Sequence, residues 1–298
     1  MIYRITHRTT FRYKYPVSLG NHLAYLMPRQ LRHRQSASSE LHISPTPVTR
    51  TERLDYFGNR VCFFTVREPH RELVVEARSN VTLKDGVQPW PRHSLAWEDV
   101  ARMLPEDPTP EGLDAYQFAF ESPRIRARPE FADYALQSFT PGRPLHQALL
   151  HLTDRIHTDF RFDSKVTNVR TPAEEVFRKR RGVCQDFAHV QIACLRSIHL
   201  AARYVSGYLR TYPPPGKPRL IGADASHAWV SAYCPGSGWL DVDPTNNVVP
   251  SDGHVTLAWG RDYSDVSPLR GLVLGGGAHT LKVAVDLEPM ETSDLLQS

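Results

Sequence analysis

The sequence predicts an α+β protein in which an antiparallel β-sandwich is followed by helices and a second antiparallel sheet. Three observations support this prediction. The first 86 residues contain short runs rich in Tyr, Thr and Val, the middle of the chain changes to helical periodicity, and strand patterns return after residue 200. With 298 residues, the chain is long enough for one large domain or two ordinary ones.

Residues 1–86 are assigned to an N-terminal β-sandwich domain because their strand-like runs are short and regularly interrupted. Turn signals rich in Pro, Gly and Asn fall at 45–47, 57–59 and 67–70. Strands at this spacing are typical of an antiparallel sandwich. The expected strands are residues 1–15, 42–44, 48–56, 61–66 and 72–83.

A Pro-rich stretch at residues 87–110 predicts a linker that contains one short helix at 96–103. Residues 111–298 then form the second predicted domain, which begins with helices and ends with strands. Helices are expected at 113–120, 131–139, 144–160, 172–180 and 184–199, and strands at 202–211, 226–233, 238–242 and 280–287.

The composition is that of a folded soluble protein, with 41% hydrophobic and 23% charged residues. No run approaches the roughly 18 apolar residues of a membrane span, so no membrane partner is expected. Arg4 and Arg8 interrupt any apolar segment near the start, so no secretory signal is readable and the cytoplasm is expected.

The formal net charge of +4 is unevenly distributed, since residues 1–86 carry 14 Lys and Arg against 7 Asp and Glu. The excess includes the cluster Arg29, Arg32, His33 and Arg34, which a nucleic-acid site would also contain. No aromatic-rich RNA motif or helix-turn-helix pattern accompanies it. We therefore expect a solvated basic face and no nucleic-acid partner, while the oligomeric state is not readable from the sequence.

Four cysteines stand at positions 62, 184, 194 and 234, and none forms a close C-x-x-C pair. Cys184 follows a glycine turn and begins a predicted buried helix. The helix dipole favours a thiolate there, and the exposed first-turn N–H groups can donate to an oxyanion. A lone cysteine is more often a small buried hydrophobe, so this position alone does not decide its role.

A histidine and two acids stand on predicted strands after this helix. His227 begins an otherwise apolar strand, and the next strand contains Asp241 and ends at Asp243. If the two strands pair, His227 and Asp243 come side by side. A thiol, an imidazole that takes its proton and a carboxylate that orients the imidazole form a set suited to nucleophilic catalysis.

The motifs around these residues resemble those of bacterial transglutaminase-like proteins. The spacings of 43 residues from Cys184 to His227 and 16 from His227 to Asp243 also fit this family. The resemblance covers about residues 145–250 in detail, and the β-rich first 86 residues resemble the domain that commonly precedes this core in bacteria. The matching segments are GVCQDFAH at 182–189, ARYVSGY at 202–208, HAWV at 227–230 and DPTN at 243–246.

The resemblance implies a papain-like transglutaminase core with a Cys-His-Asp triad. By position, Cys184 is the nucleophile, His227 the general base and then acid, and Asp243 the orienting carboxylate. Asp241 lies two residues earlier on the same strand and remains a competitor for that role. Gln185 and Trp229 are the expected substrate-binding residues at the walls of the site.

The remaining candidates are expected to be structural. Asp186 and His189 are assigned to the local fold, with Asp186 bound to nearby backbone or to Arg203. Cys62, Cys194 and Cys234 are expected in the core. His146, His151 and His157 do not share one helical face, and the Gly275–Gly277 run lacks a P-loop lysine. No metal, nucleotide or redox cofactor is expected.

The expected activity is that of a cysteine-dependent amide-bond hydrolase or acyl transferase, which forms an acyl-thioester with a peptide or isopeptide-type substrate. Water as acceptor gives hydrolysis and an amine gives transamidation, and hydrolysis is slightly favoured. The alternatives are a crosslinking protein-glutamine transamidase and a non-catalytic interaction module. The N-terminal domain either shapes substrate access or covers apolar surface of the catalytic core, and the sequence leaves both open.

Overall fold

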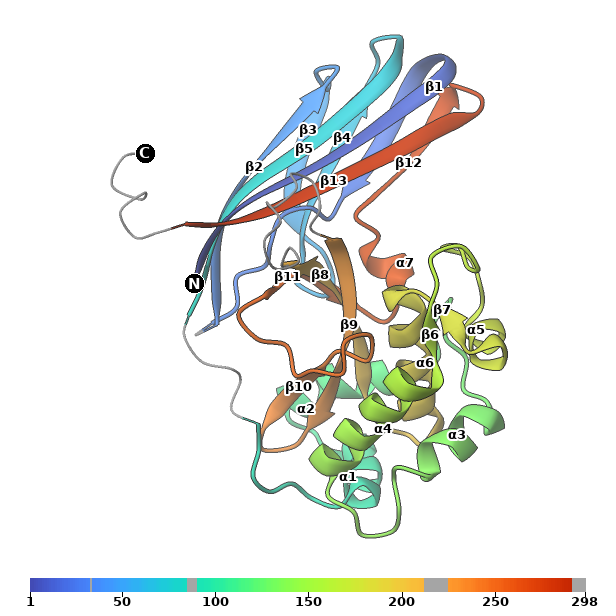
Figure 1. Cartoon of the computed structure of the whole chain (residues 1–298). Helices are drawn as coiled ribbons and strands as arrows, with labels where there is room; N and C mark the ends of the chain where they lie inside the picture. The colour runs from blue at the N-terminus through green and yellow to red at the C-terminus, as the bar shows by residue number, and fades with distance from the viewer. Residues whose placement is uncertain (33, 85–89, 212–224, 291–298) are drawn as a thin grey trace, which may run out of the picture.

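The computed structural model describes residues 1–32, 34–84, 90–211 and 225–290. Figure 1 shows two parts stacked on each other, a long curved antiparallel sheet above a group of helices that surrounds a smaller sheet. The α+β class predicted from the sequence is confirmed. Within the described ranges, no helix is both long enough and apolar enough to cross a membrane.

The upper part is one seven-stranded sheet built around the long strand β1. The first half of β1 pairs with β5 and its last residues pair with β4, with a register shift before Val17. The predicted sandwich is thus a single bent sheet whose two halves enclose one apolar cluster, which includes Phe64 and Leu73. The first five strands are β1 (Ile2–Ala24), β2 (Gln35–Ser44), β3 (Thr49–Leu54), β4 (Arg60–Val66) and β5 (His70–Leu83).

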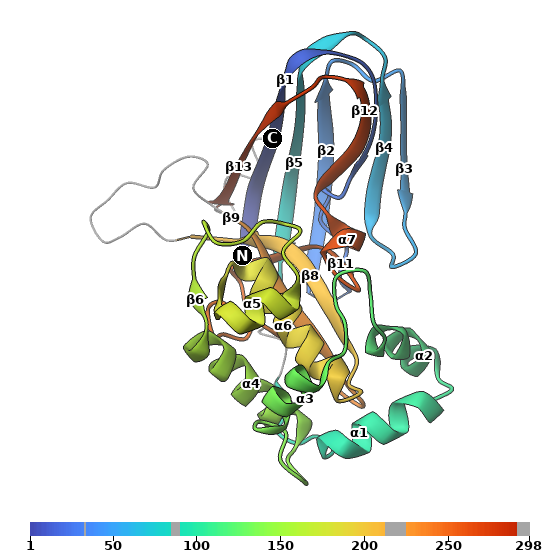
Figure 2. The same ribbon diagram turned by 90° about the vertical axis from the view of Figure 1, so that its right-hand side faces the viewer.

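Two strands from the end of the chain complete this sheet. Strands β12 (Leu269–Gly275) and β13 (His279–Met290) both pair antiparallel with β1, as Figures 1 and 2 show. Residues 111–298 therefore contribute strands to both sheets, and their assignment to one catalytic domain stays a prediction. Alternation of apolar and polar residues predicts that a strand exists, but it does not say which of two sheets the strand joins.

The stretch predicted as a linker is also packed into the lower part. Helix α1 (Trp97–Met103) and the 3₁₀ helix η1 (Leu104–Glu106) bury Val100 and Leu104 against the catalytic core. Residues 85–89 lie outside the described ranges. The predicted linker thus supplies core residues, because prolines mark turns between short helices as well as free linkers. The domain boundary at residue 110 stays a prediction.

The lower part is a four-stranded antiparallel sheet of order β10-β9-β8-β11 with the buried helix α6 (Cys184–Ser197) against it. Every side chain from Gln185 to Arg196 is buried, which makes α6 the central element of this part. The sheet strands are β8 (Ala202–Leu209), β9 (Ala225–Cys234), β10 (Gly238–Val242) and β11 (His254–Gly260). Around them lie α2 (Pro110–Tyr116), η2 (Gln117–Ala119), α3 (Pro129–Leu136), α4 (Leu145–Asp159), α5 (Ala173–Lys179), α7 (Tyr263–Val266) and a two-strand pair of β6 (Arg161–Phe162) and β7 (Arg181–Gly182).

The two parts are joined by buried hydrogen bonds to strands of the lower sheet. The Gln35 side chain donates to the carbonyl oxygen of Thr256 at 2.7 Å and accepts from its N–H at 3.0 Å. The Asn59 side chain likewise donates to the carbonyl oxygen of Trp259 and accepts from its N–H. His7 Nδ1 lies 2.9 Å from the Tyr208 hydroxyl oxygen. Amide side chains thus satisfy backbone groups of β11 that would otherwise be buried without partners.

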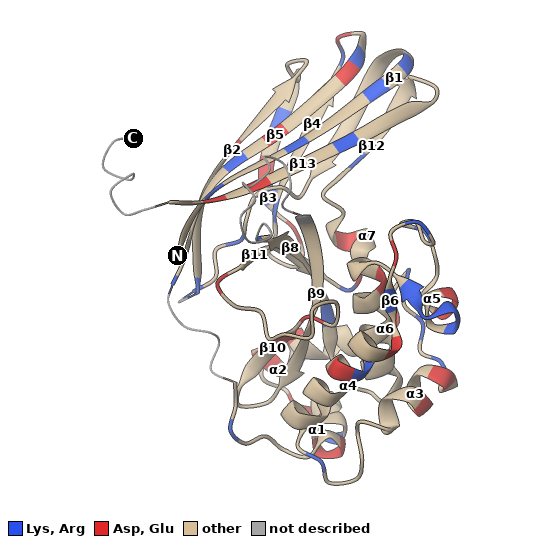
Figure 3. Ribbon diagram, in the orientation of Figure 1, with Lys and Arg blue, Asp and Glu red and all other residues tan. Residues whose placement is uncertain are grey.

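Charged side chains are spread over both parts, as Figure 3 shows, and α5 carries both signs. Two members of the basic cluster noted in the sequence are used inside the protein. The Arg29 guanidinium stacks on the Trp259 ring and donates to the Phe57 carbonyl oxygen, while Arg34 pairs with Asp241 at 3.2 Å. The absence of a nucleic-acid partner stays a prediction.

Candidate active site

Cys184 is the first residue of α6, and a buried carboxylate fixes the backbone just before it. Asp186 Oδ2 accepts hydrogen bonds from the Val183 N–H at 2.8 Å and from the Thr167 hydroxyl at 2.7 Å. Position 182 must be glycine here, because a Cβ would lie 2.6 Å from Asp186 Oδ2. Asp186 therefore binds nearby backbone, the first of the two contacts expected from the sequence.

His227 stands on β9 with its two ring nitrogens in different surroundings. Its Nε2 lies 2.7 Å from Asp243 Oδ2. Cys184 lines the same cavity and is close enough to raise the pKa of the ring, which leaves Nδ1 as the nitrogen for the sulfur. Burial alone would lower the pKa of His227. Hydrogen bonds and negative charge from Asp243 and Cys184 outweigh burial and raise this pKa from 6.5 to about 10.

Asp243 directly follows β10 and is fully buried, with an exposed fraction of 0%. Burial opposes its ionisation, but the hydrogen bonds from His227 and His254 hold its pKa well below the ordinary value. The Asn246 amide Nδ2 also donates to Asp243 Oδ2 at 2.7 Å, and the Asn246 backbone N–H donates to Oδ1 at 3.2 Å. The carboxylate is thus held in its charged form in the orientation that faces His227.

The contact between His254 and Asp243 was not anticipated from the sequence. His254 Nε2 lies 3.2 Å from Asp243 Oδ2, on the same oxygen that faces His227. The Ser251 N–H points at His254 Nδ1 at 3.4 Å, which places the His254 proton on Nε2. No local pattern indicates this role, because His254 stands eleven positions after Asp243 at the start of another strand.

Asp241, the competing acid, is used elsewhere. Its Oδ2 pairs with Arg34 of the upper part at 3.2 Å, and its charge acts on the buried Arg203. The Arg203 guanidinium stacks on the rings of Trp239 and Trp259. Arg203 therefore neighbours Asp241 rather than Asp186, and Asp243 is the acid that contacts His227.

Of the two expected substrate-binding residues, one lines the cavity at Cys184 and the other does not. Gln185 lines the cavity at Cys184, where the prediction placed it. Trp229 is 1% exposed and does not line that cavity, so its assignment to the substrate wall was wrong. Its ring lies over Gly207, where a Cβ would come within 2.4 Å of it, and meets His254 edge-on. The sequence shows Trp229 beside His227 but not the glycine that lets the ring lie flat against the sheet.

A cavity of about 330 Å³ opens at the Cys184 and His227 side chains. Its walls come from both parts of the protein, including β1 and β13 of the upper sheet. Tyr204 is close enough to Cys184 for negative charge there to raise the pKa of its phenol, after burial as the larger cause. The lining residues are His7, Thr9, Phe11, Val183, Cys184, Gln185, Tyr204, Ser206, Ser226, His227, Ala228, Tyr263, Pro268, Leu269, Leu281 and Val283.

The other thiols are buried and unpaired, as expected from the sequence. Cys62, Cys194 and Cys234 are free, and burial raises the pKa of each. Cys184 is the partly exposed cysteine of the four. His189 is structural as expected, since its Nε2 accepts a hydrogen bond from the Tyr263 N–H at the start of α7.

Within the described residues, His227, Asp243 and His254 form a buried group with ligand atoms within 4.8 Å of one another, a spacing that a metal ion also uses. Here the Asp243 carboxylate already accepts hydrogen bonds from both imidazoles and from the Asn246 amide. These bonds satisfy the carboxylate without a cation. The absence of a metal cofactor stays a prediction.

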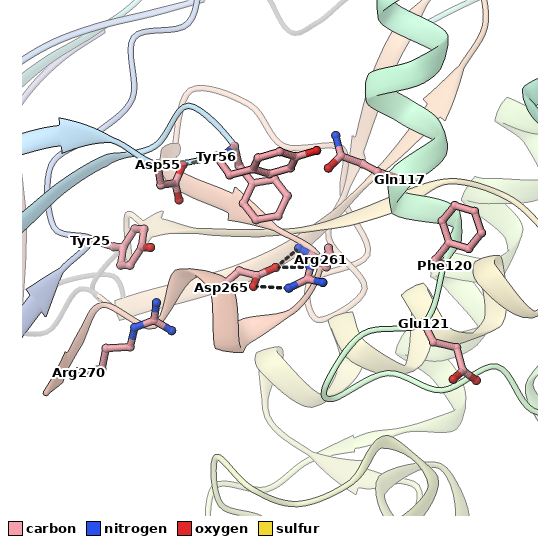
Figure 4. A pocket seen from close by; sticks show the side chains of 10 residues that line it. Tyr25, Asp55, Tyr56, Gln117, Phe120, Glu121, Arg261, Asp265 and Arg270 are labelled. Carbon is pink, nitrogen blue, oxygen red and sulfur yellow. Dashed lines mark hydrogen bonds and ion pairs between the residues drawn. The ribbon is translucent and has the colours of Figure 1, made fainter. Parts of the chain in front are cut away.

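A larger cavity of about 630 Å³ shares no lining residue with the first. Figure 4 shows Arg261 and Asp265 paired in it, with Arg270 and Asp55 nearby. It contains neither a cysteine nor a histidine. We therefore place the candidate chemistry in the smaller cavity, where the nucleophile, the base and the carboxylate meet.

Comparison with known proteins identifies related families and a related fold. The family model described as the bacterial transglutaminase-like N-terminal region matches residues 3–82, and that of the transglutaminase-like superfamily matches residues 133–244. A solved structure of a proposed cysteine protease from Cytophaga hutchinsonii covers 98% of this chain and 92% of its own, with a TM-score of 0.73 and 21% identity. That likeness shows the fold.

Relatives extend the match over nearly the whole chain. Uncharacterized proteins of Mycobacterium tuberculosis and Mycobacterium bovis are 40% identical over 297 residues, which is 97% of this chain and 93% of theirs. A protein-glutamine gamma-glutamyltransferase of Pseudomonas aeruginosa is 30% identical over 158 residues, which is 52% of this chain and 23% of that protein. The chain therefore belongs to the transglutaminase-like superfamily and carries the bacterial transglutaminase-like N-terminal region.

Proposed function

We propose that the protein is a cysteine-dependent amide-bond hydrolase that acts on a peptide or protein through an acyl-thioester. The observation that carries the proposal is the contact chain from Cys184 through His227 to the fully buried Asp243. A non-catalytic interaction module has no use for an ionised carboxylate buried behind an imidazole that faces a cysteine, because burying that charge is costly.

In the first half-reaction, the Cys184 sulfur attacks the carbonyl carbon of the amide as a thiolate, beside a His227 imidazolium whose raised pKa of about 10 keeps it protonated near pH 7. The carbon–nitrogen bond then breaks, and the His227 imidazolium gives its proton to the leaving nitrogen. The first-turn N–H groups of α6 are the proposed donors to the oxyanion, with the Gln185 side chain beside them. Asp243 keeps the imidazole oriented and favours its charged form throughout.

In the second half-reaction, water attacks the thioester carbon and gives its proton to His227, and the sulfur leaves as the thiolate. We favour water over a lysine amine because, among the residues that the structure describes, none that lines the cavity is an Asp or a Glu. A carboxylate there would attract a protonated lysine side chain, and Asp243 is too deeply buried to do so. Transamidation remains the second candidate, supported by the Pseudomonas relative named as a gamma-glutamyltransferase.

The cellular setting is part of the same proposal. The four cysteines are free and the reaction needs Cys184 reduced, which supports a reducing compartment such as the cytoplasm. The proposed partner is the peptide or protein substrate.

The test combines labelling with product analysis. Iodoacetamide near neutral pH should alkylate Cys184 much faster than the three buried cysteines, which act as internal controls. Mass spectrometry of peptide mixtures incubated with the protein, with and without a primary amine, then distinguishes cleaved peptide, deamidated glutamine and amine adduct. Cys184→Ala should remove every product.

Cleaved or deamidated peptide that persists when the amine is present supports hydrolysis. A dominant amine adduct would replace the proposal with transamidation. Equal and slow labelling of all four cysteines, with no product of any kind, would leave only the interaction module.

A further inference from the structure

The wall of the cavity that faces Cys184 comes from the upper sheet and is apolar. Phe11 and Thr9 on β1 pair in register with Leu281 and Val283 on β13, so that the four side chains form one patch on the sheet. Leu269 and Pro268, at the start of β12, extend this patch toward α7. The catalytic groups and this wall come from opposite parts of the protein and meet across a single cavity.

This wall leaves large apolar side chains open to solvent. Leu281 is 56% exposed and Val283 is 47% exposed, although both line the cavity beside a nucleophile. A ligand that covers them gains the free energy of removing apolar surface from water. Exposed leucine and valine side chains at this place therefore favour an apolar group over a polar one.

The described residues that line the cavity carry no permanently charged side chain. None of them is a Lys, Arg, Asp or Glu. His7, the remaining titratable imidazole of the upper wall, has its pKa lowered to about 4 by burial and is neutral near pH 7. The larger cavity of Figure 4, by contrast, is lined by five charged residues. A charged substrate side chain would lose water in the Cys184 cavity without gaining a partner.

We propose that the patch formed by Phe11, Leu281 and Val283 selects substrates with an uncharged apolar side chain on the acyl side of the attacked carbonyl. The inference rests on the proposed function, because it assigns the cavity to the acyl group held by Cys184. The acyl part stays bound through both half-reactions while the amine part must leave. We therefore assign the apolar wall to the acyl part.

The experiment uses two chloromethyl ketone probes that alkylate Cys184 by displacement of chloride. One is acetyl-leucine chloromethyl ketone and the other is acetyl-glutamate chloromethyl ketone. With the full-length protein near pH 7, the leucine probe should label Cys184 at least roughly tenfold faster than the glutamate probe, a ratio typical of apolar pockets. Iodoacetamide, which is too small to reach across the cavity, is the reference probe for every variant.

Two substitutions test whether the patch causes the preference. Leu281→Lys should reduce the leucine-to-glutamate ratio toward one or invert it, because the introduced ammonium group pairs with the glutamate carboxylate. The matched control is Leu272→Lys on β12, which is 83% exposed and does not line the cavity, and its ratio should stay at the wild-type value. Val283→Lys repeats the test at the next cavity-lining residue of β13 in case Leu281→Lys does not fold.

The outcomes separate the two proposals. A wild-type ratio near one, with fast iodoacetamide labelling of Cys184, would overturn the selectivity while leaving the catalytic proposal intact. An equal change of ratio in Leu272→Lys would also overturn it, because charge at a distance would then be the cause. Failure of iodoacetamide to label Cys184 preferentially would contradict the proposed function itself.

Discussion

The two sides of the Cys184 cavity differ in how they treat polar groups. On the side of α6 and β9, the reacting groups are buried among hydrogen-bonding side chains, with Asp243 at 0% exposure between two histidines and an asparagine amide. On the side of β1 and β13, apolar side chains such as Leu281 are exposed, and none of the described residues by which these two strands line the cavity is a Lys, Arg, Asp or Glu. The difference indicates that the side of α6 and β9 serves proton transfer and the side of β1 and β13 serves substrate recognition. Substitutions on the first side should change the rate of reaction, and substitutions on the second should change the preference between substrates.

The largest effect on folding is expected when residues 1–86, which supply β1 and its neighbours in the upper sheet, are removed. A chain that begins near residue 87 lacks β1, so β12 and β13 lose the strand with which both pair, and β11 loses Gln35 and Asn59. We expect insoluble or unfolded protein, because exposed strand edges and unpaired buried backbone groups both disfavour the native state. Solubility and circular dichroism are the measurements.

Co-expression of residues 1–86 as a separate chain is the control, and it should restore at least part of the soluble material. A truncated protein that folds alone and still labels at Cys184 would show that the upper sheet is not needed for the core.

A second prediction compares the two acids of the catalytic side. Asp243→Ala should lower the rate of product formation by roughly 10²–10⁴-fold, because His227 loses its orienting partner. Asp241→Ala should reduce stability instead, since it removes a carboxylate whose charge acts on Arg34 and on the buried Arg203. Rates per folded molecule and urea unfolding distinguish the two, and reversed results would mean that Asp241 orients the imidazole.

The pH dependence of stability provides a third prediction. The raised pKa of His227 stabilises the fold fully below about pH 6.5, and this stabilisation is lost as the pH rises to about 10. The lowered pKa of Asp243 stabilises the fold above about pH 4, and this stabilisation is lost as the pH falls. The free energy of unfolding of Asp243→Asn should therefore lie furthest below wild type, by roughly 3 kcal/mol, between about pH 4 and 6.5.

Urea unfolding at several pH values measures this difference, and the gap between the two proteins should narrow toward pH 10. A difference in unfolding free energy that does not change with pH would show that the His227–Asp243 pair stabilises the fold through packing rather than through charge.

The smallest effect is expected at His254, which acts on Asp243 rather than on substrate. His254→Phe should lower the rate of Cys184 alkylation by roughly tenfold or less and shift its pH profile, because Asp243 loses one of its hydrogen bonds. His254→Gln retains an N–H donor and should recover most of the rate. If both variants reduce stability but leave the pH profile of alkylation unchanged, His254 has only a packing role beneath Trp229.

The sequence predicted the local features of this protein well, because they depend on neighbouring residues. Strand β10 lies at the predicted residues 238–242, and α6 begins at the predicted Cys184. Contacts between distant segments were missed. The residues around Val285 do not indicate that β13 pairs with β1. The residues around His254 do not indicate its contact with Asp243, and those around Gly207 do not indicate that this glycine makes room for Trp229.

The pairing of β1 with β13 has a consequence for how the protein is made. Ile2 pairs with Met290, so β1 leaves the ribosome long before β13 can cover its second edge. Contacts of such large sequence separation form slowly, and an uncovered edge is open to wrong pairing in the meantime. The recognition wall beside Cys184 is therefore among the last surfaces to form. A nascent or prematurely terminated chain that already contains the catalytic residues but not β13 should lack substrate selection, which delays selective activity until β13 has been made.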